Sequence, residues 1–305
     1  MNPARGIGLK VLAVALFMGM AICIKVVSAN MPPGQIVFFR SFLGLPVILG
    51  WLWHARQLHD GLKTAHPLGH LWRGLLGVSA MGCSFTALGL LPLPDVTAIS
   101  YASPVLVTIF AAMFLGETVR AYRIGAVMLG LAGVLIVLAP RLSVLNEATP
   151  WQTVGALTAL MGAVFGALAQ VTVRSLLETE TTAGIVFYFS LSCSVLALLT
   201  LPWGWVWPTP FEAALLVAIG VLGGFGQIAQ TECYRHAEVA VIAPFEYTSM
   251  LLALAAGYFL FSEVPTGAML AGAALVVVAG LIIVFRERQL GIERRKARQT
   301  ATPQG

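Results

Sequence analysis

The chain has 305 residues, of which 58% are hydrophobic and only 10% are charged, and its mean hydropathy is +0.88. Soluble domains carry roughly a quarter charged residues, so this composition excludes an ordinary cytosolic enzyme and a disordered protein. The net charge of +5 does not indicate a nucleic-acid partner, because the basic residues are scattered between apolar runs and gathered near the C-terminus.

Apolar stretches of about the length that crosses a bilayer as a helix follow one another along the chain. Short breaks rich in proline and glycine separate them, such as residues 31–34 and 91–95. Because the stretches are continuously apolar and do not alternate, they predict helices and not barrel strands. The sequence therefore predicts an all-α polytopic membrane protein with ten transmembrane helices. These spans are expected near residues 9–29, 34–53, 72–91, 96–116, 121–140, 151–174, 184–202, 213–234, 239–261 and 267–285.

The Lys and Arg residues predict the orientation of the spans. With the N-terminus in the cytoplasm, 15 of the 18 fall on the inner side, among them Lys10 and Arg73. Only Arg141 falls outside, and Lys25 and Arg40 lie within spans. We therefore expect a multi-pass protein of the cytoplasmic (inner) membrane with both termini in the cytoplasm.

The second half of the chain repeats motifs of the first. Residues 36–42 (Ile-Val-Phe-Phe-Arg-Ser-Phe) recur as residues 185–191 (Ile-Val-Phe-Tyr-Phe-Ser-Leu), and residues 101–103 match residues 247–249. Arg40 has no basic counterpart in this repeat, since Phe189 holds its place. A site that binds an asymmetric molecule requires such an asymmetry.

The repeat divides the chain into two five-helix units, residues 9–140 and 151–285, followed by a basic cytoplasmic tail at 286–305. Because five is an odd number, the second unit enters the membrane from the side opposite to the first. An inverted repeat of this kind is typical of transporters that work by alternating access.

Several motifs resemble the EamA family of the drug/metabolite transporter superfamily. They are Phe-Phe-Arg-Ser-Phe at 38–42, Leu-Gly-Glu at 115–117, Ala-Pro-Phe-Glu-Tyr at 243–247 and Phe-Ser-Glu-Val-Pro at 261–265. The chain is similar over essentially its whole length to a bacterial subgroup that includes S-adenosylmethionine carriers, riboflavin carriers and metallophore exporters. The resemblance implies a ten-helix carrier of small organic metabolites that does not hydrolyse ATP.

Ionisable side chains inside the spans are candidates for substrate binding, because such groups usually face a cavity or a partner. Glu246 follows Pro244 in the ninth span, where a carboxylate beside a loosened helix can bind a cation or carry a proton. The alternative for Glu246 is a structural ion pair with Arg235 or Lys25. Lys25 and Arg40 lie towards the outer half, where each can hold an anionic group or extend to the headgroups.

Tyrosines and amides complete the predicted set. Tyr101 and Tyr247 correspond in the repeat and can either stack on a flat ligand or pack in the core. Gln227 and Gln230 share one helix face and can line a polar path. The predicted substrate-binding residues are Lys25, Arg40, Tyr101, Gln170, Gln227, Gln230, Glu246 and Tyr247.

Three further residues are predicted to be structural or to take part in gating. Glu117 and Glu263 end the fourth and ninth spans on opposite sides of the membrane, which favours a role in tying helix ends. Pro244 loosens the ninth span beside Glu246.

Three function classes follow from these features, and one of them, a receptor or scaffold without transport, is disfavoured by the inverted repeat. The first is a secondary active or facilitative transporter of a small organic metabolite, zwitterionic, amino-acid-like or cofactor-like. The second is a membrane-embedded transferase, which is disfavoured because the only aspartates, Asp60 and Asp95, lie outside the spans. We expect no metal and no cofactor. The expected partners are the metabolite and the lipid bilayer, without nucleic acid, and the sequence leaves a homodimer open.

Overall fold

The computed structural model describes residues 3–56, 58, 63–115, 121–142, 150–176, 179–236, 245–246 and 248–300. Within these residues the chain is helical and contains no strand, which confirms the predicted all-α membrane fold. The helices are α1 (Pro3–Val27), α2 (Pro33–His54), α4 (Pro67–Leu90), α5 (Leu93–Ser100), α6 (Ala102–Leu115), α7 (Ala121–Leu142), α8 (Pro150–Leu176), α9 (Thr182–Leu198), α10 (Pro210–His236), α12 (Thr248–Phe261) and α13 (Gly267–Thr300).

Each predicted span falls on a helix, and the fourth is divided between α5 and α6. The division lies at Tyr101, whose backbone N–H donates to the carbonyl of Ala98, three residues back instead of four. This tighter turn interrupts the regular helix between the two segments. Among the helices of the described residues, five are long and apolar enough to cross a membrane, namely α1, α2, α4, α8 and α10.

Several helix ends differ from the predicted ones. α1 begins at Pro3 and α4 at Pro67, six and five residues earlier than the apolar windows begin. Proline is well placed in a first helical turn, where no intrahelical partner for its nitrogen is needed. Apolar windows therefore underestimate α1 and α4, whose first turns carry polar residues. In the predicted ninth span, residues 239–244 and 247 lie outside the described residues, and α12 is described from Thr248.

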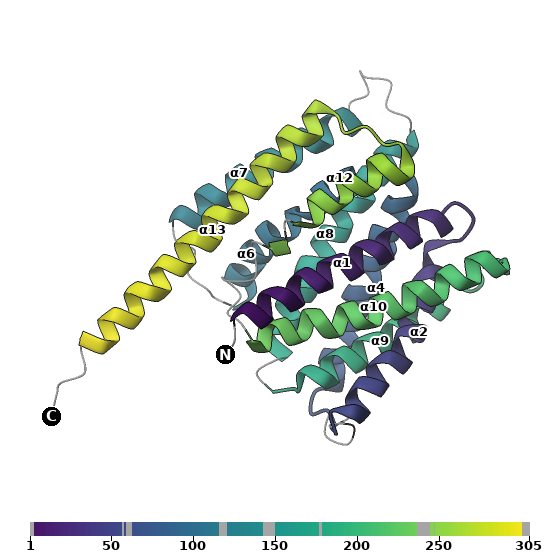
Figure 1. Cartoon of the computed structure of the whole chain (residues 1–305), viewed down its shortest axis with the longest axis horizontal. Helices are drawn as coiled ribbons and strands as arrows, with labels where there is room; N and C mark the ends of the chain where they lie inside the picture. Colours follow the sequence, from purple (N-terminus) through teal and green to yellow (C-terminus); the bar gives the residue numbers. More distant parts are fainter. Residues whose placement is uncertain are drawn as a thin grey trace.

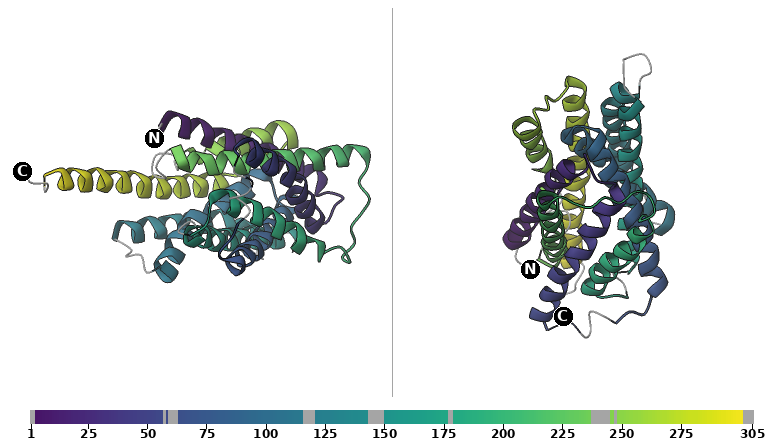
Figure 2. Two further views of the ribbon diagram at one scale, coloured as in Figure 1. Left: turned by 90° about the horizontal axis from the view of Figure 1, so that it is seen from below. Right: turned by 90° about the vertical axis from the view of Figure 1, so that its right-hand side faces the viewer.

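The last helix also extends past the predicted end of its span at residue 285, because α13 continues without a break from Gly267 to Thr300. Residues 286–300 are thus the end of the last helix. Figure 2 shows this end of α13 extending well beyond the other helices.

Several of the main helix contacts recur between the two halves of the chain. Figure 1 shows two of the packed pairs, α1 with α10 and α7 with α13. If α1, α2, α4, α6 and α7 correspond to α8, α9, α10, α12 and α13, the packing of α1 on α10 is matched by that of α8 on α4. Likewise α2 on α10 is matched by α9 on α4, and α1 on α12 by α8 on α6. Two further contacts, α2 with α9 and α7 with α13, join counterparts directly.

Glycines allow the closest of these contacts. A Cβ at Gly133 on α7 would lie 2.7 Å from the carbonyl oxygen of Gly272 on α13, so neither position has room for a side chain. Gly220 and Gly224, whose spacing predicts close helix contact, lie on α10 against α2, where an added Cβ at Gly224 would be 3.2 Å from the Gly44 carbonyl oxygen. The two halves of the chain therefore meet backbone to backbone.

Candidate functional site

Arg40 is buried where α2 packs on α10. Only 6% of the residue is exposed, and its Nη2 group donates to Oε1 of Gln227 over a long 3.5 Å. Its Cζ atom lies 5.7 Å from the ring centroid of Phe189 on α9. The alternative that Arg40 extends to the headgroups is therefore not what the structure shows, and two of the predicted residues lie together between the halves.

Lys10 on α1 connects two other predicted residues. Its Nζ atom lies 3.0 Å from Oε1 of Gln230 on α10 and 3.2 Å from Oε2 of Glu246. The Lys10 side chain is 1% exposed, whereas that of Glu246 is 49% exposed. Of the segment around Glu246, residues 245–246 form a short helical turn, while 237–244 and 247 lie outside the described residues. The basic partner of Glu246 is Lys10, whereas the sequence suggested Arg235 or Lys25.

Tyr101 directs its hydroxyl group towards the same segment. The residue is 4% exposed, and the Tyr101 hydroxyl lies 2.6 Å from Oγ of Ser249. Ser249 Oγ in turn donates to the carbonyl oxygen of Glu246 at 2.7 Å. The junction of α5 and α6 is thereby linked to the backbone beside the half-exposed carboxylate.

Lys25, in contrast, has its contacts within the chain at the other end of α1. Its Nζ atom lies 2.9 Å from Oε1 of Glu263 and donates to the carbonyl oxygens of Leu91, at 2.6 Å, and Leu88, at 3.3 Å. An ammonium has three donors, so in this conformation Lys25 has none left for a substrate. Oε2 of Glu263 accepts the N–H of Leu93 at 2.9 Å, a contact of the kind expected for a residue that ties helix ends.

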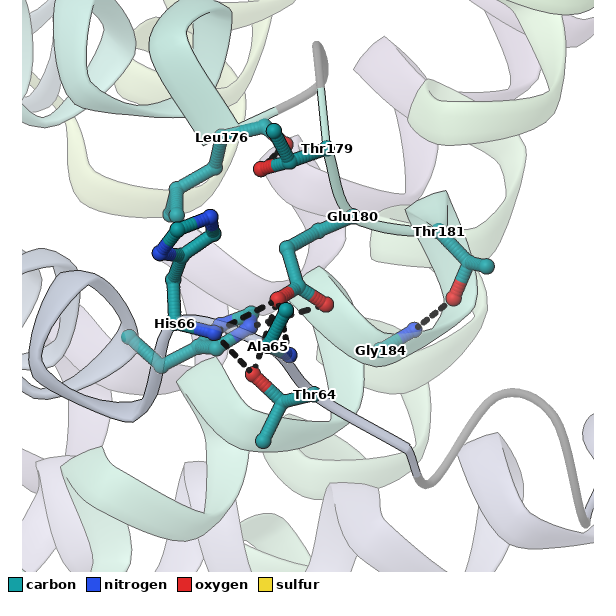
Figure 3. A network of polar contacts seen from close by, with 9 residues as sticks. Thr64, Ala65, His66, Leu176, Thr179, Glu180, Thr181 and Gly184 are labelled. Atoms are coloured by element: carbon teal, nitrogen blue, oxygen red, sulfur yellow. Dashed lines mark hydrogen bonds and ion pairs between the residues drawn. The ribbon is translucent and has the colours of Figure 1, made fainter.

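A second carboxylate ties the chain at the opposite end of the bundle (Figure 3). Oε1 of Glu180, between α8 and α9, accepts hydrogen bonds from Oγ1 of Thr64 at 2.9 Å and from the N–H groups of Ala65 at 2.7 Å and His66 at 2.9 Å. Its Oε2 lies 3.5 Å from Nε2 of His70. The carboxylate thus caps the start of α4, where the helix dipole favours a negative charge.

The electrostatics of Glu180 follow from these contacts. Burial raises the pKa of the carboxyl group, but the hydrogen bonds from Thr64, Ala65, His66 and His70 stabilise the ionised form more strongly. The net result is a pKa below the ordinary carboxyl value.

A matching carboxylate lies at the start of α10, the counterpart of α4. Oε1 of Glu212 accepts from Nδ2 of Asn30 at 2.8 Å, and its Oε2 accepts from the backbone and side chain of Thr209, each at 2.8 Å. Each end of the bundle therefore has a carboxylate that joins a short loop of one half to the start of a helix in the other half.

The remaining predicted residues are not joined by these contacts. Gln170 is exposed on α8. Glu117, Pro244 and Tyr247 lie outside the described residues, so their predicted roles stay predictions.

Comparisons with known proteins agree with this architecture. The model of the EamA-like transporter family matches residues 4–139. A pseudopaline exporter of Pseudomonas aeruginosa is 33% identical over 276 residues, which cover 90% of this chain and 94% of that protein. The chain belongs to the EamA-like transporter family.

Other relatives of this EamA-like transporter also carry transporter names. An S-adenosylmethionine uptake transporter of Rickettsia felis is 26% identical over 84% of each chain. A riboflavin transporter of Rhizobium johnstonii is 29% identical over 74% of this chain and 73% of its own. One solved crystal structure has the same fold, with a TM-score of 0.66 at 21% identity, covering 95% of this chain and 99% of that one. The protein is thus a membrane transporter of small molecules and not an enzyme.

Two residues of this EamA-like transporter were missed at the sequence level. Lys10 and Arg73 were assigned to inner segments because they precede or begin the apolar windows, yet both lie inside helices, α1 and α4. Arg73 places its Cζ atom 4.0 Å from the ring centroid of Phe189. The sequence feature that could have revealed this is the proline at the start of each helix, Pro3 and Pro67. A helix that begins at that proline contains Lys10 or Arg73 about two turns after its start.

Proposed function

We propose that the protein carries a small metabolite with both a positive and a negative group across the cytoplasmic membrane by alternating access. Two inverted five-helix units, residues 9–140 and 151–285, would expose a shared site to one side at a time. In this proposal both termini lie in the cytoplasm, as the distribution of Lys and Arg favours. Of the residues counted as inner, Lys10 and Arg73 lie within helices, but near the ends that the proposal places inside.

The observation that carries the proposal is the position of the buried charges. Arg40 with Gln227, and Lys10 with Gln230 and Glu246, all lie between helices of the first half and elements of the second. Charged groups in an apolar bundle are unfavourable unless they serve a partner or a pathway. Cationic and anionic groups at one interface suit a substrate that carries both charges.

The symmetric helix contacts support the inverted arrangement. Three helix contacts of one half, α1 on α10, α2 on α10 and α1 on α12, have counterparts in the other half, as expected if two similar units pack about an axis in the membrane plane. The site lies within one chain, so the mechanism requires a single copy, and a homodimer would contain two independent carriers.

The polar ties at the two ends of the bundle fit the two closures that alternating access requires. Lys25 with Glu263, and Asn30 with Glu212, hold one end together. Glu180 holds the other end. We propose that transport breaks the polar contacts at one end of the bundle while those at the other end stay intact.

Flux through purified protein in liposomes tests the proposal. A thermal-shift screen of metabolites, including S-adenosylmethionine and riboflavin, selects the compounds, and flux of the hits is then measured for the wild type, Glu246→Gln and Arg40→Ala. We expect both variants to lose flux while they still insert and fold, because each removes one charge of the site. Arg56→Ala, which changes an exposed arginine, is the control and should leave flux unchanged. Normal flux in both site variants would remove the assignment of these residues.

A further inference from the structure

Two arginines from different helices, Arg40 buried and Arg73 half-buried, share one aromatic ring. Arg40 on α2 and Arg73 on α4 place their Cζ atoms 5.7 Å and 4.0 Å from the ring centroid of Phe189 on α9. Phe189 itself is only 5% exposed, so the ring brings the two cations together inside the bundle and not at its surface. Both cations gain from the face of the ring, but two guanidinium groups near one another also repel.

The donors of this arginine pair are largely unused. Nε of Arg40 and Nε and Nη1 of Arg73 are buried without a hydrogen-bond partner, and Arg40 is 94% buried. Among the described residues, neither guanidinium forms an ion pair with a carboxylate. Buried guanidinium groups in proteins are normally paired, and the described residues supply no anionic partner to these two.

Small residues shape the space around these donors. A Cβ at Gly223 on α10 would lie 3.2 Å from Nε of Arg40, and a Cβ at Gly77 on α4 would lie 2.6 Å from Nη1 of Arg73. Glycine at both positions therefore lets the guanidinium groups lie against helix backbones. This arrangement holds the two cations in place without a protein anion.

We infer that Arg40 and Arg73 form an anion site that binds a carboxylate group of the transported molecule. The inference rests on the proposed transport function and adds to it the chemical class of one end of the substrate. The planar guanidinium matches a carboxylate through paired N–H donors, and two such groups can hold it from two helices. A carboxylate is favoured over phosphate because it carries a single charge and loses its water more easily on entering an apolar bundle.

The test is the melting temperature of the purified full-length protein with and without small anions. The probes are succinate, L-glutamate, L-glutamine and inorganic phosphate, compared at equal ionic strength. We expect the carboxylates to raise the melting temperature of the wild type by more than phosphate does. Arg40→Gln and Arg73→Gln should each lose the shift, Arg73→Lys should keep part of it, and the exposed control Arg56→Gln should keep all of it.

The ligand-free protein gives a second, independent readout. If the arginines await an anion, Arg73→Gln removes an unpaired buried charge and should melt at the same temperature as the wild type or higher. If Arg73 had only a structural role, Arg73→Gln would instead lower the melting temperature of the ligand-free protein. The inference is overturned if no carboxylate shifts the wild type, if phosphate shifts it more, or if Arg73→Gln melts lower and retains the shift. Flux without carboxylate dependence would leave the transport proposal intact and remove only the anion site.

Discussion

The ammonium group of Lys10 depends on partners from distant parts of the sequence. It is 1% exposed, and its carboxylate partner, Glu246, is half-exposed. A buried ammonium that loses such a partner is unfavourable, because its remaining donors cannot reach water. The pair therefore stabilises the closed approach of α1 to the turn before α12, in addition to any contact with a substrate.

Replacing Glu246 with Gln should lower the free energy of unfolding by about 1 kcal/mol, a small value because Glu246 is partly in contact with solvent. Adding Lys10→Met should recover most of this loss, since the double variant no longer buries an ammonium whose carboxylate has been removed. Thermal unfolding in one detergent compares the four proteins of this cycle. Additive losses in the double variant would show that the two side chains do not interact.

Glu180 predicts a dependence of stability on pH. Its pKa in the folded protein lies below the ordinary carboxyl value of 4.5, so ionisation stabilises the folded state above that value. The contribution is lost as the pH falls through the lower folded pKa. Glu180→Gln should therefore be less stable than the wild type at neutral pH, and the difference should shrink in the acid range below about pH 4.5.

Melting temperatures of both proteins from pH 7 to pH 3 measure this effect. Thr64→Val removes one of the donors to Glu180 and serves as a milder comparison. Its melting temperature should fall less below that of the wild type at neutral pH, and this difference should also shrink in the acid range. A difference that stays constant across the range would contradict the assignment of the stabilisation to ionised Glu180.

At the scale of helices, the close packing of α7 on α13 is the tightest constraint. A Cβ at Gly133 would meet backbone atoms of α13, 2.7 Å from the Gly272 oxygen and 3.0 Å from the Val276 nitrogen, and backbone cannot move as a side chain can. Gly125 on the same helix has open space around the same position.

Gly133→Ala should therefore destabilise the protein, because the two helices must separate, by about 1–3 kcal/mol. Gly125→Ala is the matched control and should stabilise it by up to about 1 kcal/mol, since alanine favours the helix where nothing is displaced. Chemical unfolding followed by circular dichroism gives both values. Equal effects of the two substitutions would show that α7 and α13 do not approach as closely as described.

Helices were easier to predict than their ends. Continuous apolar runs identified every span, because the requirement to satisfy backbone groups in lipid leaves only helices. The first turns of α1 and α4, residues 3–8 and 67–71, were missed, because a hydropathy window starts only where the apolar run becomes continuous. The α13 extension was missed for the same reason, since its end is basic.

At the scale of the whole molecule, the residues that join the halves could be predicted only in part. Arg40, Gln227, Gln230 and Glu246 are marked by polarity inside apolar runs. Glu180 carries no such mark, because it lies in a polar loop and its partners are 114 to 116 residues away along the chain. Long-range pairing of this kind depends on how the halves pack.

The topology predicts which loops face the same side of the membrane. Asn30, Trp207 and Glu212 lie at one end of the bundle, whereas Arg56 and Thr64 lie in the connection between α2 and α4 that approaches Glu180 at the other end. We expect single cysteines at Asn30 and Trp207, in a background without the four native cysteines, to react with a membrane-impermeant maleimide from outside intact cells.

A cysteine at Arg56, which is also exposed, should react only after the membrane is opened, and it controls for reagent access. Labelling of Asn30 and Trp207 from opposite sides would overturn the ten-span topology. It would also remove the inverted repeat on which the transport mechanism depends.

The last helix has a practical consequence. α13 contains 34 residues and so measures about 50 Å, roughly 20 Å more than the hydrocarbon of a bilayer is thick. Its C-terminal end therefore extends beyond the hydrocarbon as a continuation of the helix. A fluorescent reporter fused to the C-terminus would be held away from the mouth of the bundle, and its distance from a dye near His54 would report tilting of the last helix during turnover.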